Sequence, residues 1–225
     1  GGGRKVRPGE ISLATGGILF LDELPEFSKN ALEVLRQPME EGRVVISRTE
    51  GTYEFPAEFQ LVAAMNPCKC GYYPDRSKCH CLPGEVAKYV KRISRPLLDR
   101  IDICVEIPRV EYRDLTSEEE NESSAKMRKR VEQARQIQEK RYEKAGWKFN
   151  SRLGTAAIRE FCPLGTDEQK LMELAFERMN LSARGYHRVI KVARTIADLA
   201  GEETIREPHL LEALGYRSAY QKFWE

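Results

Sequence analysis

Long apolar runs are missing from this 225-residue sequence, and none approaches the roughly 18–20 residues of a membrane-spanning helix. This absence excludes an integral membrane protein with helical spans, and we expect no membrane partner. No apolar segment follows the three N-terminal glycines, so no secretion signal is visible. We therefore expect a cytoplasmic protein.

An excess of charge of one sign is also missing, since the formal net charge is +2. Residues 1–110 carry 16 Lys+Arg against 15 Asp+Glu, and residues 111–225 carry 21 against 20. Neither half has the composition of a broad basic surface, so any contact with nucleic acid must be local, on a hairpin or a loop. Hydrophobic residues nevertheless make up 41% of the chain, which is enough for a sizeable core.

Strand patterns occupy the first half of the sequence. Short apolar runs predict buried strands at 18–21, 59–65 and 101–107, and alternation around a Glu-Gly turn predicts a β-hairpin at 43–55. Between them, Ser28 as N-cap and Gly42 as stop signal bound one expected helix. A further helix is expected at 85–98.

Helical patterns replace the strands after about residue 111. A long charged helix is expected at 117–145, where most charged faces of this kind are simply solvated. Thr166 and Gln169 have the spacing of a capping box, and Ser182 and Gly201 bound another helix. A last helix is expected to begin at Pro208 and to end before Gly215. The predicted fold class is therefore α/β followed by all-α, with domains at 1–110 and 111–225.

The strongest chemical signal is the pair Asp22 and Glu23, which directly follows the strand at 18–21. Ligands bind at the carboxyl ends of strands in open α/β sheets, where two neighbouring acids can have different tasks. Asp22 can hold Mg²⁺, and Glu23 can polarise a water for phosphoryl transfer. The plainer interpretation is a strand that ends in a solvated acidic turn.

Four segments of the first half together resemble the magnesium-chelatase-like AAA+ ATPases, most closely the ComM/YifB type of competence protein. They are Gly9–Ala14, Leu19–Phe27, Ala64–Cys68 and Leu97–Asp102, and Ser182–Arg188 resembles the C-terminal domain of the same family. The resemblance implies a partial P-loop ATPase core with a parallel sheet, followed by a helical lid, and it implies ATP and Mg²⁺ as cofactors.

The resemblance also implies roles for individual residues. Asp22 and Glu23 would be the Walker B acids, and residues 43–55 the pre-sensor-1 hairpin. Asn66 would be sensor 1, Arg100 the arginine finger and Arg184 sensor 2, which binds the nucleotide from the helical lid. Taken alone, Asn66 is also an ordinary turn residue before Pro67, and Arg100 could form a surface ion pair with Asp99 or Asp102. The plainer interpretation of Arg184 is a solvated helix N-terminus.

One motif of that family is absent from these 225 residues. No segment matches the phosphate-binding loop G-x-x-x-x-G-K-[ST], because the glycine cluster at 1–3 lacks the Lys-Ser/Thr continuation. We therefore expect the sequence to be a C-terminal fragment, inactive by itself, of an ATPase that works as a ring, and we expect that ring to be a hexamer.

Four of the six cysteines fall within fourteen residues, as Cys68, Cys70, Cys79 and Cys81. Four thiolates can close a tetrahedral Zn²⁺ site, although C-x-C spacing is tighter than the common C-x₂-C. His80 is a possible substitute ligand. Free cysteines or adventitious disulfides are the alternative.

The hairpin carries Arg43 and Arg48, which could contact DNA phosphates in the pore of a ring. A solvated hairpin tip is the alternative. The function expected from the resemblance is a DNA motor for branch migration or recombination of incoming strands. The rivals are the motor subunit of a metal chelatase and a non-enzymatic, zinc-bearing interaction module.

Overall fold

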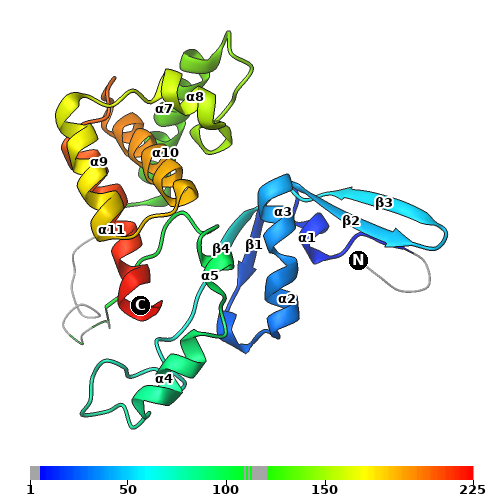
Figure 1. The fold of residues 1–225 in the computed structure, drawn as a ribbon. Helices are drawn as coiled ribbons and strands as arrows, with labels where there is room; N and C mark the ends of the chain where they lie inside the picture. The colour runs from blue at the N-terminus through cyan, green and yellow to red at the C-terminus, as the bar shows by residue number, and fades with distance from the viewer. Residues whose placement is uncertain (1–5, 109, 111, 113–120, 225) are drawn as a thin grey trace. The chain divides into compact units, whose positions relative to one another are not determined.

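The computed structural model describes residues 6–108, 110, 112 and 121–224. The chain divides into two compact units, one of Gly1–Ile101 with Lys222–Glu225 and the other of Asp102–Gln221. Among the described residues, all strands lie in the first unit, and the second is helical (Figure 1). A mixed α/β part followed by helices was therefore predictable from the sequence.

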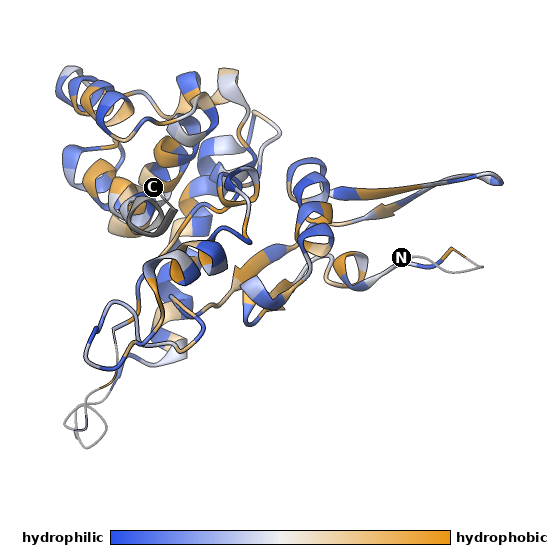
Figure 2. Cartoon of the chain, turned by 60° about the horizontal axis from the view of Figure 1, so that its bottom comes forward, coloured by the Kyte–Doolittle hydropathy of each residue, from blue (hydrophilic) through white to orange (hydrophobic). Residues whose placement is uncertain are grey.

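The first unit contains a small parallel sheet. Strand β1 (Ile18–Leu21) pairs with β4 (Gln60–Ala63), in a register that runs from Ile18 opposite Gln60 to Leu21 opposite Ala63. Both strands were predicted, although β4 is shorter than expected. Alternate apolar side chains of β1 remain open to solvent, with Ile18 63% and Phe20 59% exposed, and Figure 2 shows the hydrophobic colouring of the two strands.

The predicted third strand at 101–107 is wrong, because these residues form no strand in the structure. Ile103, Val105 and Ile107 are all exposed. An apolar pattern makes a strand only where a neighbouring strand accepts and donates its backbone hydrogen bonds. Here the Cys104 N–H instead donates to the Tyr216 carbonyl oxygen, 3.1 Å away.

The predicted hairpin is confirmed. Strands β2 (Arg43–Arg48) and β3 (Gly51–Pro56) pair antiparallel, with Arg43 opposite Pro56 at the base and Arg48 opposite Gly51 beside the turn. Gly42 precedes the hairpin in a left-handed conformation with φ 68°, which glycine adopts without strain. The hairpin projects away from the β1–β4 sheet as an arm (Figure 1).

Each of the two helices predicted in the first unit is divided by a proline. Ser28 caps α2 (Lys29–Val34) as expected, but a second helix, α3 (Arg36–Glu41), follows Leu35. Pro38 has no N–H to donate to the carbonyl of Val34, so the helix is interrupted there. Pro96 has the same effect on the helix predicted at 85–98. This segment forms two helices, α4 (Pro83–Val90) and α5 (Arg95–Leu98). The unit also has short helices α1 (Glu10–Leu13) and η1 (Leu24–Glu26).

The regular elements in the described part of the second unit are helices. They are α7 (Ser124–Tyr142), η2 (Asn150–Arg152), α8 (Thr155–Phe161), α9 (Thr166–Arg178), α10 (Ala183–Ala200) and α11 (Glu207–Trp224). Their core is formed by buried side chains from α7 to α11, among them Tyr142, Ile158, Met172, Val189, Ile190, Ile205 and Leu210. None of the helices in the described part of the chain could span a membrane.

Three boundaries in this unit differ from the prediction. Helix α7 begins after the N-cap Ser123, and part of the expected 117–145 helix lies outside the described residues. Gly165, not Thr166, is the N-cap of α9, and the Gln169 side chain donates to the Leu164 carbonyl at 2.8 Å, so the predicted capping box is wrong. Helix α11 continues past Gly215 because one glycine weakens a helix without ending it.

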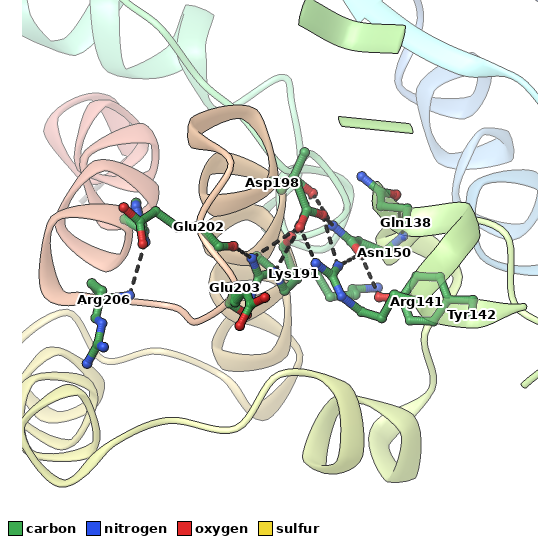
Figure 3. A network of polar contacts seen from close by, with 12 residues as sticks. Gln138, Arg141, Tyr142, Asn150, Lys191, Asp198, Glu202, Glu203 and Arg206 are labelled. Carbon is green, nitrogen blue, oxygen red and sulfur yellow. Dashed lines mark hydrogen bonds and ion pairs between the residues drawn. The ribbon is translucent and has the colours of Figure 1, made fainter. Parts of the chain in front are cut away.

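A buried polar network joins α7, η2 and α10 (Figure 3). The side chain of Asn150 accepts a hydrogen bond from the Tyr142 hydroxyl at 2.6 Å and donates to Asp198 at 2.8 Å. Asp198, which is 2% exposed, also pairs with Arg141 and Arg194. Because these buried polar groups have partners, the network fixes the three elements relative to one another.

Candidate functional site

The candidate site lies where β1 and β4 end. The Ala64 N–H donates to the Leu21 carbonyl at 2.9 Å, and the Leu24 N–H returns to the Ala64 carbonyl at 3.0 Å. These two bonds tie the turn after β1 to the end of β4. The structure thus brings the backbone of the Asp22–Glu23 turn beside the segment that leads to Asn66, at one edge of the sheet.

The acidic turn has an unusual backbone. Glu23 has φ 51° and ψ 45°, in the left-handed region that non-glycine residues seldom occupy, while the Asp22 carboxylate accepts the Glu23 N–H at 2.8 Å. Both side chains are exposed. Burial, together with the charges of Glu26 and Glu23, raises the pKa of Tyr89, a buried residue of α4. Strained residues gather at functional sites, and exposed carboxylates are available to Mg²⁺.

Asn66 is exposed and leads directly into the cysteine loop, residues 67–82. A Cβ placed on Gly71 would lie 3.6 Å from Asn66 Oδ1, so the loop backbone lies against this side chain. Gly71 itself has φ 75°. The position of Asn66 therefore depends on the fold of the loop as well as on β4.

Arg100 is buried rather than displayed on the surface, with 8% of the residue exposed. One guanidinium nitrogen lies 2.7 Å from Glu40 Oε1, another donates to the Pro96 carbonyl, and Nε has no hydrogen-bond partner among the described atoms. Glu40, at the end of α3, was not expected as a partner. No sequence spacing links residues 40 and 100.

Arg184 lies on the helical unit, exposed, in the first turn of α10. The Ser182 side chain caps this helix by accepting the Gly185 N–H at 3.0 Å, as the sequence predicted. One turn later Arg188 pairs with Asp102. Asp22, Glu23, Asn66 and Arg100 all belong to the other unit.

The two arginines of the hairpin differ in their surroundings. Arg43 lies at the base, where it pairs with Glu54 at 2.9 Å and with Glu41 at 3.3 Å. Arg48 lies beside the turn at the far end of the arm and is exposed. Arg48 is therefore the better placed of the two to meet an external phosphate.

The four clustered cysteines converge. Their Sγ atoms all lie within 4.8 Å of one another, and no disulfide joins them. Burial opposes ionisation of Cys68, but hydrogen bonds from the Tyr73 N–H and from Cys70 lower the pKa of its thiol to about 6. Burial raises the pKa of Cys79 to about 11. The cluster thus has one thiol ready to be a thiolate near neutral pH.

Comparison with known families accounts for nearly the whole chain. Residues 1–115 match the family described as magnesium chelatase, subunit ChlI, and residues 121–217 match the C-terminal family of the same subunit. The chain belongs to the magnesium chelatase ChlI family. Membership implies the AAA+ fold and, for the family in general, ATPase activity with ATP and Mg²⁺.

Individual relatives agree with this assignment. The competence protein ComM of Haemophilus influenzae is 47% identical over 219 residues, which cover 97% of this chain and 42% of the relative. YifB of Escherichia coli is 43% identical over the same shares. The magnesium-chelatase 38 kDa subunit of Acidiphilium rubrum is 24% identical over 93% of this chain and 54% of its own length. This ChlI-family chain therefore spans less than half the length of its ComM and YifB relatives.

Proposed function

We propose that the full-length protein hydrolyses ATP, with the acidic turn after β1 as its Walker B element. The observation that carries this proposal is the pairing of β1 with β4, which sets Asp22, Glu23 and the segment before Asn66 at one sheet edge. Carboxylate oxygens are the ligands that Mg²⁺ prefers, so the donor set fits the metal. When bound, Mg²⁺ neutralises charge on the nucleotide phosphates.

In this proposal each polar residue has a separate task. Asp22 holds Mg²⁺, and Glu23 orients and polarises the attacking water. Asn66 contacts the terminal phosphate or that water. Arg100 completes the site of a neighbouring subunit in a ring, which we propose to be a hexamer, and Arg184 contacts the phosphates from the helical unit.

The phosphate-binding loop is not among these 225 residues. We propose that the rest of the full-length protein supplies it, which agrees with the 42% of ComM and of YifB that the chain covers. Phosphate binding in P-loop enzymes rests on backbone N–H groups of that loop and on the helix that follows it. The chain alone would then lack most of the nucleotide-binding energy.

We further propose that the motor acts on DNA by branch migration. Support comes from the 47% identity to a competence protein and from the hairpin arm with the exposed Arg48 near its tip. The test is ATP-dependent movement of a labelled DNA junction by the full-length protein. We expect movement with ATP and none with the Glu23→Gln variant. ATP hydrolysis without any effect on DNA junctions would contradict the DNA role and leave the ATPase intact.

The alternative is a chelatase motor subunit that drives metal insertion by another protein. The 24% identity to a magnesium-chelatase subunit favours it, but that identity is half of the value for ComM. ATPase stimulation by a chelatase partner and not by DNA would favour this alternative. A non-enzymatic, zinc-bearing module would bind no ATP in its full-length form.

A further inference from the structure

The cysteine loop brings two C-x-C pairs together at one point. Three of the sulfur pairs are 3.3, 3.6 and 3.8 Å apart, between Cys68 and Cys70, Cys70 and Cys79, and Cys68 and Cys79. Cys81 completes the group, and all four Sγ atoms lie within 4.8 Å of one another. Cys68 and Cys79 are buried, so the cluster is closed on the protein side.

This spacing is close to that of a metal-bound tetrathiolate. Four sulfurs at the corners of a tetrahedron, each about 2.3 Å from a central Zn²⁺, are about 3.8 Å from one another. A disulfide would instead place two sulfurs about 2.05 Å apart. Soft thiolates with tetrahedral geometry favour zinc among the common divalent ions.

The loop has little else to fold around. Its apolar cluster contains only Cys68, Cys79 and Val86, with Tyr73 and Cys81 packed against them. The Tyr73 N–H donates to Cys68 Sγ at 3.5 Å, and Arg76 donates to the Cys81 carbonyl at 3.1 Å. Such bonds orient sulfur ligands, but they add little stability by themselves, so an ion would contribute much of the folding free energy of the loop.

We propose that Cys68, Cys70, Cys79 and Cys81 bind one structural Zn²⁺, which holds the loop between Asn66 and helix α4. Four protein ligands leave no open coordination position, so the ion takes no part in chemistry. Val86 of α4 packs on the cluster, and Gly71 lies against Asn66. The ion therefore fixes the side chain that we propose as sensor 1, a second step that rests on the proposed function.

The first experiment measures metal in the full-length protein purified without chelators. We expect one Zn²⁺ per chain and, after cobalt exchange, the near-ultraviolet charge-transfer absorption of a cobalt tetrathiolate. Cys79→Ser should lose the metal and Cys104→Ser, the matched control outside the cluster, should keep it. Wild-type protein with no zinc and four freely titratable thiols would overturn the proposal, as would iron with inorganic sulfide in place of zinc.

Because Cys79→Ser could disturb folding, a second measurement uses the wild-type sequence. Chelator treatment should open residues 67–82 to limited proteolysis, and added Zn²⁺ should restore protection. Equal cleavage with and without metal would overturn the structural role. Metal removal should also reduce ATP turnover at least about tenfold, because small displacements of a group that positions the reactants have effects of this size or larger. If the protein binds zinc but its ATP turnover is unchanged when the zinc is removed, only the link between the ion and Asn66 is refuted. If the zinc-loaded protein has no ATP turnover at all, the proposed ATPase is refuted and the zinc site is not.

Discussion

A guanidinium nitrogen of Arg100 lies 2.7 Å from the carboxylate of Glu40, and this contact holds a buried arginine inside its own subunit. A buried charge is costly unless it is paired, so Glu40 compensates Arg100 as long as no other anion does. For Arg100 to act on a neighbour's nucleotide, the pair must open. Arg100 can therefore have two roles, as the internal partner of Glu40 or as a contact to a neighbour's nucleotide, and mutation can distinguish them.

Subunit mixing tests the role of Arg100. We expect full-length Arg100→Ala rings to be inactive, and mixtures with Glu23→Gln subunits to regain partial ATPase activity. In a mixed ring, a site with an intact Glu23 can lie beside a subunit with an intact Arg100. If Arg100 serves only as the partner of Glu40, no mixing ratio will rescue activity, and Glu40→Ala will lower stability as much as Arg100→Ala.

The acidic turn offers a test with a control in the same segment. Glu23→Gln should keep ATP binding and lower turnover by at least about two orders of magnitude, because the group that orients the water is lost. Asp22→Asn should weaken Mg²⁺-dependent nucleotide binding. Glu26→Gln, which removes only an exposed ion pair with Arg92, should stay close to wild type. Near-normal turnover in Glu23→Gln would show that the acidic strand has been misinterpreted.

The hairpin arginines should differ in their effect on DNA binding. Arg48→Ala should weaken DNA affinity uniformly across sequences and reduce the salt dependence by roughly one phosphate contact. Arg43→Ala should have a smaller effect on DNA affinity, because the Arg43 guanidinium already forms ion pairs with Glu41 and Glu54. Fluorescence anisotropy with labelled DNA at several salt concentrations measures both. Equal losses in the two variants would contradict the assignment of the tip as the contact.

Nucleotide binding can be tested on the 225-residue chain itself. We expect no tight ATP binding and no ATPase activity, because the phosphate-binding loop is not in this sequence. Isothermal titration calorimetry with Mg²⁺–ATP is the direct measurement. Micromolar affinity would mean that other residues hold the phosphates.

The buried network of the helical unit should dominate its stability. Asp198→Asn leaves Arg141 and Arg194 without their carboxylate and should lower the free energy of unfolding by about 3–5 kcal/mol, the range for breaking a buried pair. The control, Asp167→Asn, removes an exposed pair with Lys170 and should cost less than about 1 kcal/mol. Urea unfolding followed by tryptophan fluorescence compares them, and similar losses would refute the special role of Asp198.

Local signals explain which elements could be predicted. Strand β1 was recognisable because its four apolar residues are followed by two acids, and α10 because Ser182 and Gly201 mark its ends. The interruption at Leu35 also follows from local chemistry, since Pro38 removes one specific hydrogen bond. The lack of a strand at 101–107 does not follow from local chemistry. A strand forms only beside a neighbouring strand, and the sequence pattern at 101–107 cannot reveal whether that neighbour is there.

The candidate site was predictable to a similar extent. The acidic pair and the cysteine spacing are local patterns, and the structure places the former at the sheet edge and brings the four sulfurs together. The Glu40–Arg100 pair and the contact of Gly71 with Asn66 join residues through the fold. The polar side chain of Asn150 likewise gives no periodic sign that it will be buried.

The left-handed backbone of Glu23 places conformational strain at the residue that we propose to orient the attacking water. Glycine would adopt φ 51° without the penalty of roughly 1 kcal/mol or more that a side chain incurs there. A laboratory selection for stability alone would therefore favour glycine at position 23, and would remove the carboxylate that we propose to orient the attacking water. In the function that we propose, Glu23 thus retains the water-orienting carboxylate at a cost in conformational stability.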